Sequence, residues 1–538
     1  MTAQLKIALC QSDPTVGDLC GNANLIIEGS KQAATLGADL AVFPELMLTG
    51  YPPEDLLLHP HFIAAAERES QRIDAEVEIP TMFGSVENRA GGVANVARLS
   101  SPGAKPLSYA KCRLPNYGVF DEARYFAAGE SGLVAEINGA KVGISICEDI
   151  WHTGHPTDSL IEGGAEVIVN LSASPFHAGK IDDRLDVLSK QAATAKVPIL
   201  YCSMVGGQDE LVFDGRSIVI DSSGALVGRA MAFKADTLIV DLANLTATRC
   251  EDDVSGAAEI EHALHLGLAD YVNKNGFNGV VLGLSGGIDS AVVATLAVDA
   301  LGADRVHAAV MPSPWSSKET QQDARDLATA LGIDLHEFSI EPAMRAFADT
   351  LDGSSSGPGS EIAAENIQAR IRGNLLMALS NTHGWLVVTT GNKSELAVGY
   401  STLYGDAAGG FGLLKDVPKH VVYALARLRN ERPDRPIPVD VITRAPSAEL
   451  RPGQKDEDSL PPYDVLDDIL LRYVELRQDA GEIAGAGHSA ETVNRILRMV
   501  DLAEYKRRQY PPGVKITPLA FGRDRRMPMT NGWRNSIL

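Results

Sequence analysis

Short runs of apolar residues alternate with longer, more polar stretches along most of the chain. In the first half, the clearest runs predict buried β-strands at residues 6–10, 40–43, 142–146 and 167–171. Residues 22–36 instead repeat apolar side chains at helical spacing, and Gly37 follows as a typical helix end. This alternation predicts an α/β fold for the first half of the chain.

The second half repeats the same rhythm. Residues 279–282 predict a buried parallel strand, and the apolar residues after Ser290 predict a buried helix that ends at Gly302. Strands that alternate with helices favour a parallel sheet covered by helices. Further elements are expected as strands at 306–311, 335–339 and 385–390, and as helices at 317–331 and from about residue 361.

The length of 538 residues exceeds what one hydrophobic core usually supports, so at least two domains are expected. Their boundary is predicted between residues 242 and 260, where polar, acidic and glycine-containing stretches follow one another. This places a first domain at 1–245, a linker at 246–260 and a second domain at 261–538.

Composition narrows the classes of function. The net charge of −22 argues against non-specific nucleic-acid binding, so an anionic substrate must be held by local clusters of cationic side chains. No apolar run reaches the roughly 18 residues that a membrane-spanning helix needs, and the N-terminus lacks a secretory pattern. The six cysteines show no zinc-binding spacing. We therefore expect a cytoplasmic enzyme without a membrane or nucleic-acid partner.

Glu45, Lys111 and Cys147 each follow the end of a predicted strand, which is where α/β folds place their functional residues. Together they suit amide hydrolysis: a thiolate attacks the carbonyl carbon, a carboxylate moves the proton, and an ammonium ion stabilises the oxyanion. Each residue alone also has an ordinary structural explanation, since a cysteine after an apolar strand is commonly a small buried hydrophobe.

The sequence around these residues resembles the amidase domain of the nitrilase superfamily. The matching words are Phe-Pro-Glu-Leu at 43–46, Lys-Cys-Arg-Leu-Pro at 111–115 and Ile-Cys-Glu-Asp-Ile-Trp at 146–151. The resemblance implies an αββα sandwich. It also implies roles for three residues: Cys147 as the nucleophile, Glu45 as the base and Lys111 as the stabiliser of the oxyanion.

Residues 170–176 resemble the segment that holds the substrate in the glutamine-hydrolysing branch of that superfamily. The resemblance implies a set of glutamine-binding residues, among which Glu122 matches the family's second, supporting glutamate. For the others, the alternative is a solvated loop residue. The set is Tyr117, Glu122, Ser174 and Lys180.

A glycine-rich turn joins the predicted strand at 279–282 to the helix that follows. A strand, such a turn and a helix N-terminus form an anion site, because free backbone N–H groups and the helix dipole face the ligand. A carboxylate at Asp289 would repel phosphate unless a Mg²⁺ ion bridges the two. The alternative is an ordinary turn between a strand and a helix. The residues concerned are Gly283, Leu284, Ser285, Gly286, Gly287, Ile288, Asp289 and Ser290.

This turn resembles the Ser-Gly-Gly-x-Asp-Ser loop of the ATP pyrophosphatases, which cradle the pyrophosphate that leaves when an acceptor is adenylated. A second carboxylate, Glu395, follows the predicted strand at 385–390. A Mg²⁺ ion shared with Asp289 would need such a partner from a neighbouring strand end. Asp289 and Glu395 are therefore the candidate metal ligands.

Four motifs in the second half occur in an order that resembles the NAD⁺ synthetase family, and an amidase domain ahead of them is similar to its glutamine-dependent form. They are Ser-Gly-Gly-Ile-Asp-Ser, Asn-Ile-Gln-Ala-Arg-Ile-Arg, Thr-Gly-Asn-Lys-Ser-Glu and Tyr-Gly-Asp. The resemblance implies a doubly wound parallel sheet of the adenine nucleotide alpha hydrolase type. It implies ATP binding by the turn at 283–290 and by Thr390, with Mg²⁺ between them and the two carboxylates. For deamido-NAD⁺ it implies Asn366, Arg370, Glu395, Asp406 and Lys506.

Several segments depart from a rigid core. Residues 407–410 read Ala-Ala-Gly-Gly where the family often has glycines, which leaves the role of Asp406 open. Residues 352–360 are rich in serine and glycine, which predicts a mobile loop. Residues 431–463 are rich in proline and charge; their composition indicates a linker or disorder, whereas the resemblance implies a second mobile loop.

The C-terminal region carries a basic cluster suited to dinucleotide phosphates or to a solvated patch: Lys506, Arg507, Arg508, Lys515, Arg523, Arg525 and Arg526.

The expected activity is the amidation of deamido-NAD⁺ by ATP and by ammonia from L-glutamine, through an adenylated intermediate. Two alternatives stay open. One is another ATP-pyrophosphatase amidotransferase with a different acceptor, and the other is a nucleotide-sensing scaffold with inactive sites. Because ammonia would diffuse away unless it is enclosed, and because the resemblance implies packed subunits, a homo-oligomer is expected.

Overall fold

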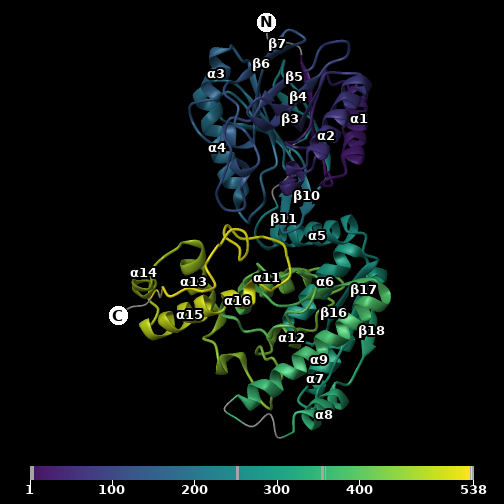
Figure 1. Ribbon diagram of the computed structural model, residues 1–538, viewed down its shortest axis with the longest axis vertical. Helices are drawn as coiled ribbons and strands as arrows, with labels where there is room; N and C mark the ends of the chain where they lie inside the picture. The colour runs from purple at the N-terminus through teal and green to yellow at the C-terminus, as the bar shows by residue number, and fades with distance from the viewer. Residues whose placement is uncertain (1–4, 250–253, 353–356, 358, 534, 536–538) are drawn as a thin grey trace. The chain divides into compact units, whose positions relative to one another are not determined.

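The computed structural model describes residues 5–249, 254–352, 357, 359–533 and 535. The acidic residues 251–253 of the predicted linker lie outside the described residues, as do residues 353–356 and 358 of the predicted mobile loop. The chain divides into two compact units, Met1–Ser255 and Gly256–Leu538, and Figure 1 shows the elements of each.

The first unit contains two large sheets. The seven-stranded sheet has the order β15-β14-β1-β2-β3-β4-β5, and the six-stranded sheet has the order β13-β12-β9-β8-β7-β6. The first consists of β1 (Lys6–Gln11), β2 (Leu40–Val42), β3 (Thr81–Arg89), β4 (Gly92–Ser100), β5 (Leu107–Ala110), β14 (Asp236–Asp241) and β15 (Thr246–Ala247). The second consists of β6 (Leu133–Ile137), β7 (Ala140–Ile146), β8 (Val167–Ser172), β9 (Ile199–Ser203), β12 (Ile218–Ile220) and β13 (Leu226–Arg229). A hairpin, β10 (Val205–Gln208) and β11 (Leu211–Asp214), is separate.

Side chains that alternate along β1 show how the layers stack. Leu9 belongs to the core between the two sheets, together with Val142 of β7. Cys10 belongs to the core on the opposite face of β1, together with Ile26 of α1 (Leu19–Thr35), and α2 (Pro60–Glu76) contributes to the same core. Leu188 of α4 (Lys180–Ala195) packs in a third core on the six-stranded sheet, near α3 (Thr157–Glu162). The unit is therefore a four-layer αββα sandwich, which confirms the predicted fold.

The second unit is built on a five-stranded sheet of order β18-β17-β16-β19-β20, in which every pairing is parallel. The strands are β16 (Gly279–Gly283), β17 (Val306–Val310), β18 (Asp334–Glu337), β19 (Trp385–Thr389) and β20 (Phe411–Gly412). The chain runs outward from β16 to β18 and then returns to β19 on the other side. The sheet is therefore doubly wound, as predicted, and its topological switch point lies between β16 and β19, where such sheets bind ligands.

Helices connect and cover these strands. α6 packs on β16 and β17, whereas α9 packs on β16 and β19, and α5 and α11 pack on α6. Their bounds are α5 (Gly256–Lys274), α6 (Ile288–Leu301), α7 (Lys318–Leu331), α8 (Glu341–Thr350), α9 (Ser360–His383), α10 (Lys393–Val398), α11 (Lys419–Arg429) and α12 (Val439–Thr443).

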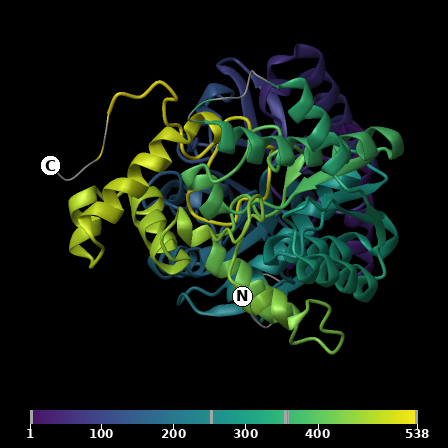
Figure 2. The ribbon, with the colours of Figure 1, turned by 90° about the horizontal axis from the view of Figure 1, so that it is seen from below.

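A group of C-terminal helices, the yellow cluster in Figure 2, packs with the end of α10 around a further apolar core. Leu466 and Ile469 of α13 (Tyr463–Leu470) pack with Ile496 and Val500 of α15 (Ala490–Leu502). Shorter helices accompany them, α14 (Ala480–Gly485) and α16 (Glu504–Arg507). Sequence analysis did not predict these helices. Among the helices of the described residues, none combines the length and the apolarity needed to cross a membrane.

The basic cluster near the C-terminus is largely occupied by ion pairs within the protein. Arg507 Nη2 lies 2.8 Å from Glu504 Oε2, and Arg508 Nε lies 2.9 Å from Glu504 Oε1. Lys515 Nζ lies 2.8 Å from Asp524 Oδ2. These partners give Arg507, Arg508 and Lys515 a structural role, in place of the phosphate contact considered from the sequence.

Residues 431–463, whose composition indicated a linker, pack on the second unit. Gln368 of α9 donates a hydrogen bond from Nε2 to the carbonyl oxygen of Leu450 at 2.9 Å. Thr320 of α7 donates from Oγ1 to Glu449 at 3.0 Å. The segment is therefore attached to the helices that flank the sheet and does not connect domains.

Candidate functional site

Cys147 lies at a strained turn between β7 and a short helix. It directly follows β7 and begins a 3₁₀-helix, Cys147–Ile150. Its φ of 42° lies in the left-handed region, which is costly for a residue other than glycine. Its side chain is buried. A strained strand-to-helix turn of this kind is typical of a nucleophile that is presented at the end of a sheet.

Asp149 ties this turn to the end of the strand that precedes Lys111. Its Oδ2 accepts a hydrogen bond from the N–H of Ile146 at 3.1 Å. Its Oδ1 accepts hydrogen bonds from the N–H groups of Cys112 and Arg113, at 3.1 and 2.9 Å. One buried carboxylate therefore holds the turn and the end of β5 together. This role was not apparent from the sequence, in which two adjacent carboxylates follow the cysteine.

Lys111 links two buried carboxylates. Its Nζ donates hydrogen bonds to Glu45 Oε1 at 2.7 Å and to Glu122 Oε1 at 2.8 Å. Glu45 is held further by Asn95 Nδ2 at 2.8 Å and by the N–H of Ala173 at 3.1 Å. Both sheets of the sandwich thus orient Glu45, because Asn95 lies on β4 and Ala173 follows β8.

These side chains and Cys147 share one electrostatic environment. Burial raises the pKa of the Cys147 thiol, Glu45 raises it further, and Lys111 opposes the rise. Burial alone would lower the pKa of Lys111, but Glu122 and Glu45 outweigh it, so the amine stays charged. At rest, Cys147 is therefore a neutral thiol. Glu45, which is hydrogen bonded to the ammonium group of Lys111, is the carboxylate that can accept the proton of Cys147.

Glu148 is a further buried carboxylate, next to Cys147 in the chain. It accepts hydrogen bonds from the hydroxyl of Tyr117, at 3.1 and 3.0 Å to its two oxygens. Its Oε1 also lies 2.8 Å from Nε2 of His152. A carboxylate so placed can accept a hydrogen bond from the ammonium group of an amino-acid substrate. Sequence analysis did not single out Glu148, although its position after the nucleophile was a usable signal.

Two of the predicted glutamine-binding residues lie after β8. Ser174 is buried. Lys180, the first residue of α4, donates from Nζ to the carbonyl oxygen of Pro175 at 2.5 Å, and its Nζ lies 5.9 Å from the ring centre of Trp151. The ammonium group of Lys180 therefore places a positive charge beside the segment that follows β8.

For glutamine, the substrate expected from the sequence, we predict that Glu122→Gln lowers kcat/KM by about tenfold to a hundredfold and removes a titration from the pH profile. Burial raises the pKa of Glu122 to about 7, with Lys111 opposing the rise. Below that pH, Glu122 takes up a proton, and Glu45 is left as the charged hydrogen-bond partner of Lys111, so the Lys111–Glu45 pair competes more strongly with transfer of the Cys147 proton to Glu45. Activity should therefore fall as the pH falls. Rates of glutamine hydrolysis between about pH 5.5 and about pH 8.5 check this; an unchanged acid limb in the variant would contradict it.

In the second unit, the turn after β16 has the geometry of an anion site. Gly286 has a φ of 79°, and a Cβ there would lie 2.0 Å from the carbonyl oxygen of Thr320, so only glycine fits. Ser290 Oγ accepts a hydrogen bond from the N–H of Ser285 at 3.2 Å, and Ser285 Oγ accepts one from the N–H of Gly287 at 3.2 Å. The two hydroxyls brace the turn at the N-terminus of α6.

Asp289 and Glu395 converge on one cation, the ammonium group of Lys419. Lys419 Nζ donates hydrogen bonds to Asp289 Oδ2 and, at 3.1 Å, to Glu395 Oε1. Asn392 Nδ2 donates to the other oxygen of Asp289 at 2.8 Å. Burial would lower the pKa of Lys419, but Asp289 and Glu395 outweigh it and raise that pKa. The half-buried Thr390 precedes this group, directly after β19.

The two carboxylates predicted as metal ligands therefore come together at the switch point of the sheet, and their oxygen atoms suit Mg²⁺. Lys419 occupies the position between them and would have to release both carboxylates when an ion binds. Sequence analysis missed Lys419. Lys419 ends the segment Leu-Lys-Asp-Val-Pro-Lys, and nothing in that segment indicates that its side chain lies beside the glycine-rich loop.

The loop between α10 and β20 joins four predicted deamido-NAD⁺-binding residues that are far apart in the sequence. The hydroxyl of Thr402 donates to Asn366 at 2.8 Å, and its N–H donates to Asp406 at 2.7 Å. Arg370 donates to a backbone carbonyl of the loop at 3.2 Å. Lys506 donates to two other backbone carbonyl oxygens of this loop, both at 2.7 Å. These residues form one cluster that carries both charges.

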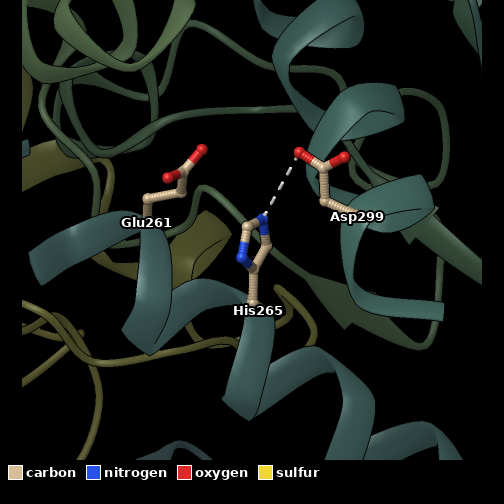
Figure 3. Close-up of side chains that lie close together, drawn as sticks. All are labelled: Glu261, His265 and Asp299. Atoms are coloured by element: carbon tan, nitrogen blue, oxygen red, sulfur yellow. Dashed lines mark ion pairs between the residues drawn. The ribbon is translucent and has the colours of Figure 1, made fainter. Parts of the chain in front are cut away.

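Another cluster of ionisable side chains lies near the C-terminal end of α6 (Figure 3). Glu261 and His265 of α5 and Asp299 of α6 have ligand-type atoms that all lie within 4.8 Å of one another. However, Arg432 Nη2 donates to both oxygens of Glu261, at 2.7 and 2.6 Å, and Arg429 Nε donates to Asp299 at 2.8 Å. Burial lowers the pKa of His265 to about 4, so it stays neutral. The two arginines neutralise the carboxylates and disfavour a divalent ion; the group is a structural ion-pair network.

Two protein-family models match this chain, one over each of the two parts that hold the sites described above. The carbon-nitrogen hydrolase family model matches residues 6–249. The NAD synthase family model matches residues 260–510. The first range holds the cysteine site, and the second holds the phosphate loop and its two carboxylates.

Individual relatives match both units together. The glutamine-dependent NAD(+) synthetase of Thermotoga maritima is 44% identical over 99% of this chain and 100% of its own length. That of Acinetobacter baylyi is 43% identical over 98% of this chain and 99% of its own length. The structure of the glutamine-dependent NAD⁺ synthetase from Acinetobacter baumannii in complex with adenosine diphosphate is 40% identical, with a TM-score of 0.77 over 99% of this chain and 100% of that chain. The chain therefore belongs to the family of glutamine-dependent NAD(+) synthetases.

Proposed function

We propose that this chain makes NAD⁺ from deamido-NAD⁺, ATP and L-glutamine. The first domain, residues 1–245, hydrolyses glutamine to glutamate and ammonia. The second, residues 261–538, adenylates the nicotinate carboxylate of deamido-NAD⁺ with release of pyrophosphate, and ammonia then displaces AMP. The observation that carries the proposal is that one chain holds a buried cysteine with a Glu–Lys pair and a glycine-rich loop with two converging carboxylates.

In the amidase step, Glu45 takes the proton from Cys147 Sγ while the sulfur attacks the amide carbon of glutamine. Lys111, fixed between two carboxylates, stabilises the negative charge that develops on the carbonyl oxygen. Glu45 then returns the proton to the amide nitrogen, so that ammonia leaves and a thioester remains. Water, deprotonated by Glu45, releases glutamate and restores the thiol.

Substrate recognition in this step follows from charge. Glu148 binds the α-ammonium group of glutamine, supported by Tyr117, and Lys180 binds its carboxylate, with Ser174 beside it. The hydrogen bonds between Glu148 and Tyr117 and between Lys180 and Pro175 support this arrangement, because they fix one anion and one cation near the nucleophile's turn.

In the synthetase step, the backbone N–H groups of the phosphate loop and the dipole of α6 hold the ATP phosphates. Asp289 and Glu395 would hold Mg²⁺, which neutralises phosphate charge when it is bound. Lys419, once released from those carboxylates, supplies a cation to a phosphate oxygen. Positioning and charge neutralisation are most of what a protein contributes to such a transfer. The deamido-NAD⁺ site is the cluster of Asn366, Arg370, Asp406 and Lys506, with Glu395.

The test is to incubate the purified protein with glutamine, ATP, Mg²⁺ and deamido-NAD⁺ and to identify the products by mass spectrometry. NAD⁺, AMP, pyrophosphate and glutamate are expected. Replacing deamido-NAD⁺ with other carboxylates distinguishes a different acceptor. Absence of any glutamine hydrolysis would instead favour a scaffold with inactive sites.

We expect the active form to be a homo-oligomer in the cytoplasm, where thiols such as Cys147 stay reduced. Ammonia that leaves the amidase site becomes protonated in bulk water and loses its reactivity, so enclosure by packed subunits would protect it. Light scattering coupled to size exclusion, with activity measured across the peak, checks the prediction. A fully active monomer would contradict it.

A further inference from the structure

The two carboxylate oxygens of Glu45 are tied to different sheets of the first unit. Oε1 accepts hydrogen bonds from Lys111 Nζ at 2.7 Å and from Asn95 Nδ2 at 2.8 Å. Asn95 lies on β4 and Lys111 directly follows β5, so both donors belong to the seven-stranded sheet. Oε2 accepts a hydrogen bond from the N–H of Ala173 at 3.1 Å, directly after β8 of the six-stranded sheet. The carboxylate therefore bridges the two sheets.

The nucleophile lies on the sheet that Oε2 contacts. Cys147 directly follows β7, which pairs in parallel with β8 in a register that sets Ile146 opposite Leu171. Asn170 of β8 also donates from Nδ2 to the carbonyl oxygen of Cys147 at 3.4 Å. The last part of β8 and the residue after it therefore contact both the turn of Cys147 and Oε2 of Glu45. Of the two carboxylate oxygens, Oε2 is the one tied to the sheet that carries the nucleophile.

The two oxygens also differ in their capacity to take up a proton. Each carboxylate oxygen offers about two lone pairs. Oε1 of Glu45 uses both, and one of its donors is an ammonium ion, which makes this oxygen the poorer proton acceptor. Among the hydrogen bonds of the described residues, Oε2 accepts a single one, from a neutral N–H group. A proton that leaves Cys147 is therefore accepted more readily by Oε2.

Asn95 holds the base and the lysine together. The residue is buried, and its carbonyl oxygen accepts a hydrogen bond from the N–H of Lys111 at 2.9 Å. Its side chain donates to Glu45, so one residue fixes the backbone of the lysine and the carboxylate of the base. The backbone of Glu45 lies against Gly84 of β3, where a Cβ would come within 2.5 Å of its carbonyl carbon. The orientation of the carboxylate therefore depends on its three donors.

Packing alone does not favour an amide at position 95. The Oδ1 atom of Asn95 is buried and accepts no hydrogen bond from the described residues. A buried polar atom without a partner is costly. The opposite orientation of the amide would set Oδ1 against the carboxylate of Glu45, which would repel it. Donation to Glu45 is therefore the interaction that an amide supplies here and an apolar side chain would not.

We propose that Asn95 is a positioning residue that, together with Lys111, occupies Oε1 of Glu45 and so directs the proton of Cys147 to Oε2. The proposal rests on the proposed roles of Cys147 and Glu45 in glutamine hydrolysis. As the S–H bond breaks, an O–H bond forms at Oε2 and the sulfur bonds to the amide carbon. Oε2 then returns this proton to the amide nitrogen as the C–N bond breaks and ammonia leaves. One oxygen both accepts and returns the proton, so the carboxylate does not have to rotate.

Asn95→Leu removes the donor and nearly keeps the volume of the side chain. In the full-length protein, kcat for glutamine hydrolysis should fall by about tenfold to a hundredfold, which is the effect of losing a hydrogen bond to a charged group. KM should stay within about threefold, because Asn95 acts on the base and not on the substrate. Ammonia-dependent NAD⁺ formation, measured on the same preparation, should not change.

Asn95→Asp keeps the shape of the side chain and makes its donor depend on pH. When ionised, the new carboxylate repels Glu45, whereas its protonated form can donate a hydrogen bond to Oε1 as the amide does. The ratio of kcat in Asn95→Asp to kcat in Asn95→Leu should rise at least about fivefold from about pH 8.5 to about pH 5.5. The ratio cancels the titration of Glu122, which both variants retain. Circular dichroism at each pH excludes unfolding.

Ser30→Ala is the matched control. It removes another buried side-chain hydrogen bond of the same unit, between Ser30 of α1 and Thr81 of β3 at 2.7 Å. Its kcat and its pH profile should be those of the unmodified protein. If Asn95→Leu does not fold, Asn95→Asp carries the test, and the rise of its kcat at low pH is then measured against the unmodified protein.

A kcat within about twofold of the unmodified protein in Asn95→Leu, or a loss confined to KM, would overturn the proposal. A ratio of the two variants that does not change with pH would refute donation from Asn95 to Glu45. Glutamine hydrolysis that persists in Cys147→Ala would refute the function on which the proposal rests, whatever the Asn95 variants show. The proposal and that function can therefore fail separately.

Discussion

Cys147→Ala is expected to lower glutamine-dependent NAD⁺ formation by at least roughly a thousandfold and to leave ammonia-dependent formation close to normal. The first loss follows because no described cysteine other than Cys147 shares a buried environment with both Glu45 and Lys111. The second activity persists because the phosphate loop and its two carboxylates all belong to the second unit. With ammonium salt as the nitrogen source, the rate should rise with pH as the fraction of free ammonia increases.

Both activities should be measured on one preparation, with circular dichroism to verify the fold. Cys10→Ala is a matched control, because Cys10 is buried in the same unit but packs in the core on the outer face of β1. It should retain glutamine hydrolysis. A folded Cys147→Ala variant that still hydrolyses glutamine would remove Cys147 from the mechanism. A variant that is inactive with ammonia as well would show that the two domains are not chemically separable.

Asp289→Asn and Glu395→Gln are each expected to lower NAD⁺ formation by at least about a hundredfold, with glutamine and with ammonia alike. Both carboxylates meet on the ammonium group of Lys419 beside the phosphate loop. Loss of either one removes half of the charge that would hold Mg²⁺, and it leaves Lys419 paired with the carboxylate that remains. Glutamine hydrolysis measured without ATP should change little.

Steady-state rates across a Mg²⁺ titration, together with calorimetric titration of Mg²⁺ in the presence of ATP, separate metal binding from catalysis. Asp304→Asn, an exposed carboxylate of the same unit, controls for the change of charge. It should behave as the unmodified protein. Near-normal rates and Mg²⁺ affinity in Asp289→Asn or Glu395→Gln would exclude that residue from the metal site.

The phosphate loop could be predicted from the sequence because its geometry is local. Its serine hydroxyls bond to backbone groups two to five residues away, and Gly286 supplies the positive φ that the turn requires. The strand before the loop and the helix after it have their own apolar patterns. A short stretch of the chain therefore contains nearly all the information that shapes this turn.

The residues of the cysteine site could be predicted only in part. The pattern of apolar strands placed Glu45, Lys111 and Cys147 at strand ends. Only the resemblance of the surrounding motifs to a known family indicated that the three residues belong to one site. The pair of Lys111 and Glu45 spans 66 residues, and no spacing rule connects such positions. Asp149 and Glu148 were missed as site residues, because their partners are set by the packing of neighbouring loops.

The sequence alone determined the two-part α/β architecture, the glycine-rich loop and the family motifs. These features depend on the spacing of apolar residues, on turn residues and on the order of short motifs, all of which can be recognised from residues that are close together in the chain. Tertiary structure alone decided which side chains pair across long separations. It set Lys419 on Asp289, which is 130 residues away, and Ser172 beside Tyr201. It also assigned Arg507, Arg508 and Lys515 of the basic tail to ion pairs within the protein. Such contacts depend on how helices and sheets pack, and burial then makes each pairing obligatory, because an unpaired polar group inside the protein is costly.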